Sequence, residues 1–336
     1  MPYAAHVRCN RMADSDCVVR SLNRDDWGAW NALVEQSPEG TIYHDYRWLD
    51  VIGVTTSSAN EVFGIFQEGR LVGGFPLQVR RKGPVRIALR PFGTPYSGLV
   101  RCAGVDWNPG DWERLFDSIR CRFVESTLTF SPYSLQVTAP TNWTCEEKWT
   151  YLLNVGDPEE MWSNFSFEVR NRIRKALKSG IEVRENSSPE NFYDLYKSVF
   201  ANQGKRIPFT KWTFSNLLTT ILEARIGTWY IAYTDDSKPV AAALFLIDSK
   251  RCYYSFAASA PELRRIGAPS LLVWRAIQDL SKSVQFFDFG GANIPSIAQF
   301  KSKFNGAKQR YMEYRTIRGN VLPALLAVYR KFKASY

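Results

Sequence analysis

The chain has 336 residues, of which 45% are hydrophobic and 23% are charged. At about 150 residues per domain, this length predicts roughly two domains, each large enough for its own hydrophobic core. The longest apolar runs, such as residues 239–247, are far shorter than the ~20 residues of a membrane-spanning helix. We therefore expect no transmembrane segment. The N-terminus has no apolar core typical of a signal peptide, so the expected location is cytoplasmic.

The residue types of several common sites are missing or scattered. Six cysteines are spread along the chain without a CxxC pair, and there are two histidines, so we expect free thiols and no metal site. The sequence contains no GxSxG, GxGxxG or GxxxxGK motif. These absences disfavour α/β-hydrolases, Rossmann dehydrogenases and P-loop NTPases.

The net charge of +10 is carried by the second half of the chain. Residues 1–150 hold 16 Lys and Arg against 17 Asp and Glu, whereas residues 151–336 hold 27 against 16. This asymmetry favours a polyanionic ligand such as a phosphorylated cofactor, RNA or an anionic membrane surface. A solvated basic surface is the alternative.

In chain order, the first half predicts two helices within residues 24–52 and two strands at 61–67 and 71–80 around a Glu-Gly-Arg turn. A polar, turn-rich stretch at 137–148 separates the halves. The second half repeats the plan, with helices at 189–200 and 211–223 and strands at 228–233 and 240–248. This similarity suggests an internal duplication.

The second half continues with a strand at 251–257, a helix at 270–282 and a compact apolar strand at 284–289 that ends in Gly290-Gly291. A short helix at 295–304, a strand at 310–315 and a final helix at 321–336 complete the prediction. A further helix carries the basic block Arg170, Arg172, Arg174, Lys175 and Lys178.

Four blocks of the second half, VRNRIRKALKSGIEV, QGKRIPFTKW, FDFGGAN and IAQFKSKF, occur in this order after SPEGTIYHDYRW of the first half. With them, residues 24–316 resemble the Fem (FemABX) family of aminoacyltransferases. Residues Arg264 to Pro269 also resemble the pyrophosphate loop of GCN5-related N-acetyltransferases (GNAT), although Pro269 replaces the final small residue.

The resemblance implies an α/β (α+β) fold of two tandem GNAT-like domains, each a mixed, mostly antiparallel sheet flanked by helices. The first would span residues 17–150 and take in a C-terminal helix at 318–336, the second would span 151–317, and residues 1–16 would form a flexible N-terminus. The implied activity is transfer of an aminoacyl or acyl group from aminoacyl-tRNA or acyl-CoA to an amine on a peptidoglycan-like precursor. No tightly bound cofactor is implied. The location implied is the cytoplasm, with the inner face of the membrane as the alternative.

The resemblance also implies site residues. Lys301 would lie near the transferred acyl group, where a cation stabilises the oxyanion of a tetrahedral intermediate, while Lys303 would be a solvated helix lysine. Arg206, Tyr43, His44 and Trp48 would bind the acceptor substrate. The donor would be held by two groups of residues, which are Arg264, Arg265 and Gly267, and Arg170, Arg172 and Arg174.

From its position, Asp288 is the expected acid/base group, because it interrupts an apolar strand just before Gly290 and burial raises the pKa of a carboxyl. Capping of the following turn is the structural alternative. Two other functions stay open at this stage. One is an acyl-CoA-dependent N-acetyltransferase that acts on an amino sugar or amino acid in polysaccharide biosynthesis. The other is a non-catalytic protein that binds RNA or a membrane.

Overall fold

The computed structural model describes residues 17–82, 85–105, 107, 109–135, 137–260 and 266–318. These form two compact units. Unit 1 comprises residues 17–53, 57–147 and 311–318, and unit 2 comprises 148–310 together with 54–56. The N-terminal segment 1–16 and the closing helix expected at 318–336 lie outside the described residues, Arg318 excepted.

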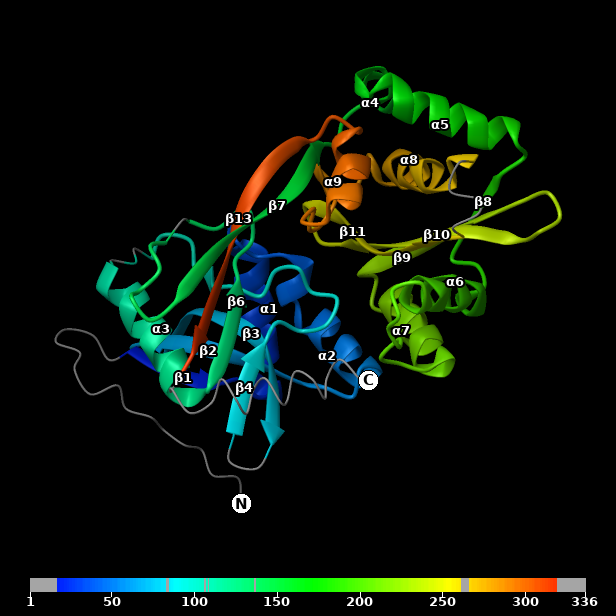
Figure 1. Cartoon of the computed structure of the whole chain (residues 1–336). Helices are drawn as coiled ribbons and strands as arrows, with labels where there is room; N and C mark the ends of the chain where they lie inside the picture. The colour runs from blue at the N-terminus through cyan, green and yellow to red at the C-terminus, as the bar shows by residue number, and fades with distance from the viewer. Residues whose placement is uncertain are drawn as a thin grey trace. The chain divides into compact units, whose positions relative to one another are not determined.

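Unit 1 is built on a mixed sheet with strand order β1-β2-β3-β4-β6-β13, and β5 pairs with β3 (Figure 1). Neighbouring strands are antiparallel except β4 and β6, which are parallel. The strands are β1 (Cys17–Ser21), β2 (Ala59–Gln67), β3 (Arg70–Lys82), β4 (Val85–Leu89), β5 (Val100–Arg101), β6 (Glu125–Thr129) and β13 (Ala307–Ile317). The helices are α1 (Trp27–Gln36), α2 (Tyr46–Thr55) and α3 (Pro109–Arg122), with 3-10 turns at Arg24–Asp26 and Ile42–His44.

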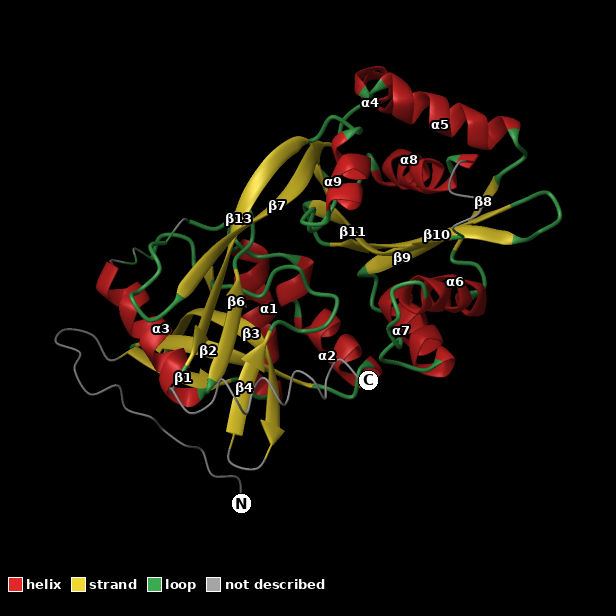
Figure 2. Cartoon of the chain, viewed as in Figure 1, coloured by secondary structure: helices red, strands yellow, loops and turns green. Residues whose placement is uncertain are grey.

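In unit 2 the strands follow the order β7-β12-β11-β10-β9-β8 and are also mixed in direction. Helix α8, with α5 against it, covers one face of these strands, and α6 and α7 cover the other (Figures 1 and 2). The strands are β7 (Thr144–Asn154), β8 (Glu182–Glu185), β9 (Gly227–Tyr233), β10 (Pro239–Ile247), β11 (Arg251–Ser259) and β12 (Phe286–Asp288). The helices are α4 (Pro158–Asn164), α5 (Phe167–Lys178), α6 (Pro189–Ala201), α7 (Lys211–Glu223), α8 (Ala268–Leu280) and α9 (Pro295–Ser302).

Strand β11 is the hydrogen-bonded neighbour of β12 over only part of its own length. These two strands are parallel and pair only from Arg251 opposite Phe286 to Tyr253 opposite Asp288. Strand β11 continues to Ser259, whereas β12 ends and the chain turns at Gly290, whose φ is +63°. Glycine adopts such a φ without a steric penalty. The pairing of β11 with β12 therefore ends beside a glycine turn.

The element predictions hold for the repeated plan. Both predicted helix pairs and both predicted hairpins are present, and the α/β fold class is confirmed. One strand is shorter than expected, because Val284 donates its backbone N–H to Leu280 at the end of α8 and so belongs to the helix terminus. The polar stretch at 137–148 is not only a linker, since β7 already begins at Thr144.

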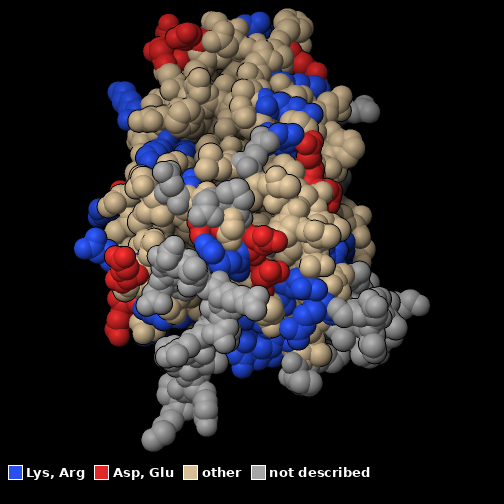
Figure 3. All heavy atoms as spheres, turned by 90° about the vertical axis from the view of Figure 1, so that its left-hand side faces the viewer, with Lys and Arg blue, Asp and Glu red and all other residues tan. Residues whose placement is uncertain are grey.

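Two further observations concern membrane-spanning segments and surface charge. Within the described ranges, no helix combines the length and apolar character that a bilayer crossing requires. On the face drawn in Figure 3, Lys and Arg side chains alternate with acidic and uncharged residues, so the positive charge does not gather there into one patch.

Candidate functional site

The polar residues that the sequence placed around Gly290 come together in unit 2. Lys301 from α9 and Asp288 from the end of β12 are both buried, with 6% and 0% of their surface exposed. Two buried ionisable groups at the end of a strand are costly unless they are partnered. Their partners therefore define what the site can do.

Lys301 is bound by the glycine turn itself. Its ammonium donates to the carbonyl oxygens of Phe289, Gly290 and Gly291, the latter two at 2.9 Å. An ammonium has three hydrogens, so these three bonds use all of them. Burial lowers the pKa of Lys301 to about 8, and the charge of Asp288 offsets part of that shift. At neutral pH the residue is thus a fixed cation that holds the turn.

Asp288 is held on the other side of the same turn. Its Oδ1 accepts the backbone N–H of Gly290 at 2.8 Å, and the Thr150 hydroxyl of β7 lies 2.8 Å from that oxygen and 3.1 Å from the Gly290 carbonyl. The carboxylate thus caps the turn. The backbone of Phe289 is also fixed to β7 through its bond to the Tyr151 carbonyl at 3.0 Å. Carboxylate, hydroxyl and ammonium therefore form one preorganised polar cluster.

Strand β11 also approaches this polar cluster, with the ring centre of Tyr254 5.8 Å from Lys301 Nζ. Its register against β10 shifts between Tyr254 and Ala257, so that Ser255 and Phe256 together face Leu244. Such a β-bulge leaves the extra residue out of the ladder. The Ser255 hydroxyl is buried and finds no hydrogen-bond partner among the described residues. A Cβ at Gly290 would meet the Tyr254 carbonyl at 3.2 Å, so a glycine keeps the turn close to β11.

Two other kinds of chemistry find little support here. Burial raises the pKa of the Cys252 thiol on β11 well above its usual value, which opposes its use as a thiolate nucleophile. Within the described part of the chain, no group of three or more His, Cys, Asp or Glu side chains is arranged to hold a metal ion.

The two expected donor-binding segments meet at one point. Gly267 caps the N-terminus of α8 with a φ of +97°, and a Cβ there would lie 2.2 Å from the backbone oxygen of Arg172 on α5. Only glycine allows this close approach. The basic helix and the α8 N-terminus, far apart in sequence, are therefore adjacent. Arg264 and Arg265 lie outside the described residues.

The basic residues of α5 have protein partners. Arg172 pairs with Glu168 at 2.7 Å, Arg170 donates to the Ser163 carbonyl at 3.0 Å, and the Arg174 guanidinium lies 5.4 Å from the Trp162 ring centre. Lys303 is not simply solvated, because it pairs with Glu168 at 2.7 Å and is 22% exposed. Its hydrogen bond lowers the pKa of Glu168.

The expected acceptor-binding residues are divided between the two units. Arg206 is exposed on the connection between α6 and α7. Tyr43, His44 and Trp48 lie in unit 1, each at most 1% exposed. Trp48 donates to the Thr94 hydroxyl at 2.8 Å, and Tyr43 packs edge-on against it. Burial lowers the pKa of His44 to about 3. All three are thus buried side chains of unit 1, and their role in acceptor binding stays a prediction.

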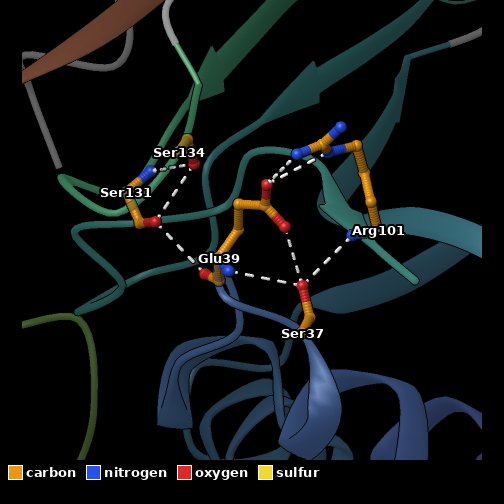
Figure 4. Close-up of polar contacts among 5 residues, drawn as sticks. All are labelled: Ser37, Glu39, Arg101, Ser131 and Ser134. Atoms are coloured by element: carbon orange, nitrogen blue, oxygen red, sulfur yellow. Dashed lines mark hydrogen bonds and ion pairs between the residues drawn. The ribbon is translucent and has the colours of Figure 1, made fainter. Parts of the chain in front are cut away.

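A buried ion pair fixes the loop before these residues. Glu39 pairs with Arg101 of β5, and the Ser37 hydroxyl donates to the same carboxylate at 2.8 Å (Figure 4). The backbone oxygen of Glu39 accepts the Ser131 hydroxyl at 3.1 Å, and Ser131 also contacts Ser134 (Figure 4). The Glu side chain is 3% exposed and the Arg side chain 14%. The segment SPEGT is thus an anchored structural loop.

Thr150, beside the turn, and Ser255, on β11, are two buried polar positions that carry no signal in the sequence alone. Thr150 and Ser255 are ordinary strand residues there, and each becomes distinctive only through β7 beside β12 and the bulge on β11. The signal that was available, an aspartate two residues before a Gly-Gly pair, led to Asp288 alone.

Comparison with known proteins identifies a domain match and solved structures with a similar fold. Residues 163–302 match the acetyltransferase (GNAT) domain model. Solved structures with the same fold include FemX, at 14% identity, with 91% of this chain and 99% of that chain covered and a TM-score of 0.65. A tandem GNAT protein from the clavulanic acid biosynthesis pathway has 12% identity, coverage of 90% and 99%, and a TM-score of 0.54. L-PGS from Bacillus licheniformis has 11% identity, coverage of 91% and 96%, and a TM-score of 0.52. No curated protein sequence matches the chain.

These likenesses show the fold. The chain shares the fold of these structures over about nine tenths of its length, and its GNAT domain match lies within unit 2.

Proposed function

We propose that this acyltransferase moves an aminoacyl or acyl group from an activated carrier to an amine on a cell-envelope precursor of the peptidoglycan type. The observation that supports the proposal is the buried cation of Lys301, held on the glycine turn where β11 and β12 diverge inside the matched GNAT domain. A fixed positive charge at this place is suited to a reaction in which negative charge develops on a carbonyl oxygen.

The chemistry needs no covalent enzyme intermediate. The amine attacks the ester or thioester carbonyl, the oxygen becomes an oxyanion, and collapse expels the carrier's hydroxyl or thiol. Because Lys301 uses its three hydrogens within the protein, its charge acts through the turn unless one bond is released. Asp288 accepts two donors and holds the turn, and it is the nearby carboxylate toward which an amine proton would move.

The donor side is proposed to lie where α5 meets the N-terminus of α8. Cations of α5 and the positive helix end both favour phosphate. An acyl-CoA donor needs the segment before Gly267, whereas an aminoacyl-tRNA donor also needs the outer face of α5. Arg206 is proposed to hold an anionic group of the acceptor, since a guanidinium binds carboxylate and phosphate well. The proposed place of work is the cytoplasm, at the inner face of the membrane.

A second candidate is an acyl-CoA-dependent N-acetyltransferase acting on an amino sugar or amino acid. The acetyltransferase (GNAT) domain match over residues 163–302 favours it. The two candidates share acyl-CoA as a possible donor and differ in the acceptor, so mass spectrometry of ligands retained by the purified protein has to score both sides of the reaction. Retained tRNA or a nucleotide-linked precursor supports the first candidate, whereas retained CoA together with an amino sugar or amino acid supports the second.

Kinetics of Lys301→Met test the shared chemistry. We expect turnover to fall by ~10²–10³-fold, as for loss of an oxyanion-stabilising group, with little change in donor affinity because the charge acts mainly in the transition state. The matched control is Lys197→Met on the exposed side of α6, since Lys303 is ion-paired. Equal, small effects of both substitutions would remove Lys301 from the mechanism.

A further inference from the structure

Apolar residues precede Lys301 on the same side of helix α9. Lys301 and Ile297 are four residues apart, and Ile294, the N-cap residue, precedes Ile297 by three. Residues with this spacing lie along one side of a helix. We call Ile294, Ile297 and Lys301 the α9 apolar edge.

Exposure rises steadily along this edge. Phe304, which comes after the helix, is 0% exposed, Lys301 is 6%, Ile297 is 38% and Ile294 is 56% exposed. The ring of Phe300 continues the apolar surface inward, with its centre 6.4 Å from that of Tyr254. The polar residues Ser296 and Gln299 fall on the other side of the helical wheel. The apolar side chains of this edge therefore extend from the buried position of Lys301 to the protein surface.

An apolar surface beside the reacting carbonyl can bind the hydrocarbon part of an acyl group. Resting on the proposed function, we infer that the α9 apolar edge binds the hydrocarbon part of the transferred acyl group. The helix rise of about 1.5 Å per residue puts Ile297 about 6 Å and Ile294 about 10 Å from Lys301 along the axis. With carbon–carbon bonds of about 1.5 Å, an acetyl group reaches neither isoleucine, whereas a chain of about eight carbons reaches both.

The two possible carriers make different demands on the edge. An octanoyl group on CoA would contact both isoleucines. A leucyl group on tRNA is shorter and would contact Ile297 alone. Dependence on Ile294 therefore distinguishes a fatty acyl donor from an aminoacyl donor, although the recognised chemistry, an apolar group on an activated ester or thioester, is shared.

The experiment uses the full chain with four donors: acetyl-CoA, octanoyl-CoA, glycyl-tRNA and leucyl-tRNA. Hydroxylamine is the acceptor, so its nitrogen bonds to the carbonyl carbon, the carrier leaves as thiol or hydroxyl, and the hydroxamate is measured. Donor binding is measured separately by calorimetry. We expect at least about a tenfold preference for the longer apolar group on the carrier that is used, since each buried methylene adds appreciable affinity.

Ile297→Asn should reduce this preference to less than about threefold, and Ile294→Asn should do so only for octanoyl-CoA. The control is Leu222→Asn on α7, whose side chain is similarly exposed at 41%. Transfer without a chain-length preference would overturn the inference and leave the proposed function intact. Octanoyl binding that depends on Ile297 but never leads to transfer would retain the apolar site and overturn the proposed function. A change in oligomeric state in the isoleucine variants would assign the edge to a second copy and overturn the inference.

Discussion

The two units run through the same series of elements and differ at its end. Each has a strand, two helices, a hairpin, a fourth strand, a helix and a strand parallel to the fourth. Unit 1 adds the short strand β5 to this series, and in unit 2 the elements β7, α4 and α5 precede it. The final strands carry similar segments, Leu-Thr-Phe-Ser at 128–131 and Phe-Asp-Phe-Gly at 287–290. In unit 1 the Thr129 hydroxyl lies 3.2 Å from Glu313, and in unit 2 Asp288 lies 2.8 Å from the Thr150 hydroxyl. Both units thus have a carboxylate–hydroxyl pair next to this strand, which is part-buried in unit 1 and fully buried in unit 2.

The difference lies in the residues after the pair. In unit 1, Phe130 is buried against Tyr314, and a Cβ at Gly98 would collide with its ring at 2.4 Å, so this end is filled. In unit 2, Gly290 and Gly291 leave carbonyls that Lys301 binds, and Lys301 is the one buried lysine of the described residues. The same series of elements therefore ends in packed aromatic side chains after β6 in unit 1 and in a buried charged residue after β12 in unit 2.

The largest expected effect tests whether the buried charges of unit 1 serve stability alone. Arg101→Met leaves the Glu39 carboxylate buried without its cation, which should cost roughly 3–5 kcal/mol of unfolding free energy. Turnover per folded molecule should not change. The control is Arg47→Met, whose partner Asp45 lies 2.7 Å away but whose own side chain is 52% exposed, so a loss of about 0–1 kcal/mol is expected. Chemical denaturation measures both. A loss of activity in folded Arg101→Met would break the comparison.

The second prediction concerns acid. Burial lowers the pKa of His44 to about 3, so below the ordinary value near 6.5 the unfolded chain binds a proton that the folded chain does not. Stability should then fall by about 1.4 kcal/mol per pH unit between pH 6.5 and 3. His44→Gln removes this component, whatever its effect on absolute stability. Denaturation from pH 7 to 4 checks the slope, and an unchanged slope would show that other groups cause it.

Unit 2 should respond to base instead. The pKa of Lys301 is lowered to about 8, so the activity that needs its charge should fall about tenfold per unit above pH 8. The contribution of Lys301 to stability should instead rise with pH above about 8. The reason is that the neutral amine is easier to bury, so the folded state loses its proton at a lower pH than the unfolded state. Lys301→Arg should extend the activity plateau to higher pH. A descending limb that does not move would assign the titration to another group.

How far the sequence predicts the molecule depends on the range of the contacts involved. Hydrophobic periodicity located α6, α7, β9 and β10 within one or two residues, because these elements depend on local spacing. The site is only partly predictable. Asp288 and Lys301 carry local motifs, but the partnership with Thr150 needs a strand about 140 residues away. Tyr43, His44 and Trp48 belong to a motif as visible as that of Asp288, and yet they are buried in the core of unit 1.

The smallest effect concerns the donor. Arg170→Glu with Arg174→Glu should weaken binding of an anionic donor several-fold while leaving the fold intact, and for tRNA it should make the salt dependence shallower. Lys197→Glu with Lys282→Glu makes the same charge change at exposed positions elsewhere in unit 2 and should have little effect. Affinity titrations at two salt concentrations compare the pairs. Equal weakening would mean that only net charge matters.

The route of the chain has a practical consequence for taking the protein apart. Unit 2 occupies a nearly continuous segment, whereas unit 1 is completed only when β13 returns to pair with β6 from Glu313 to Ile317. A fragment ending at residue 147 would leave the backbone groups of β6 bare along that edge, which invites aggregation. Expression of the first half alone should give insoluble material, and co-expression with a peptide carrying residues 307–318 should recover it. Gene dissection therefore has to keep β13 with the earlier half of the chain.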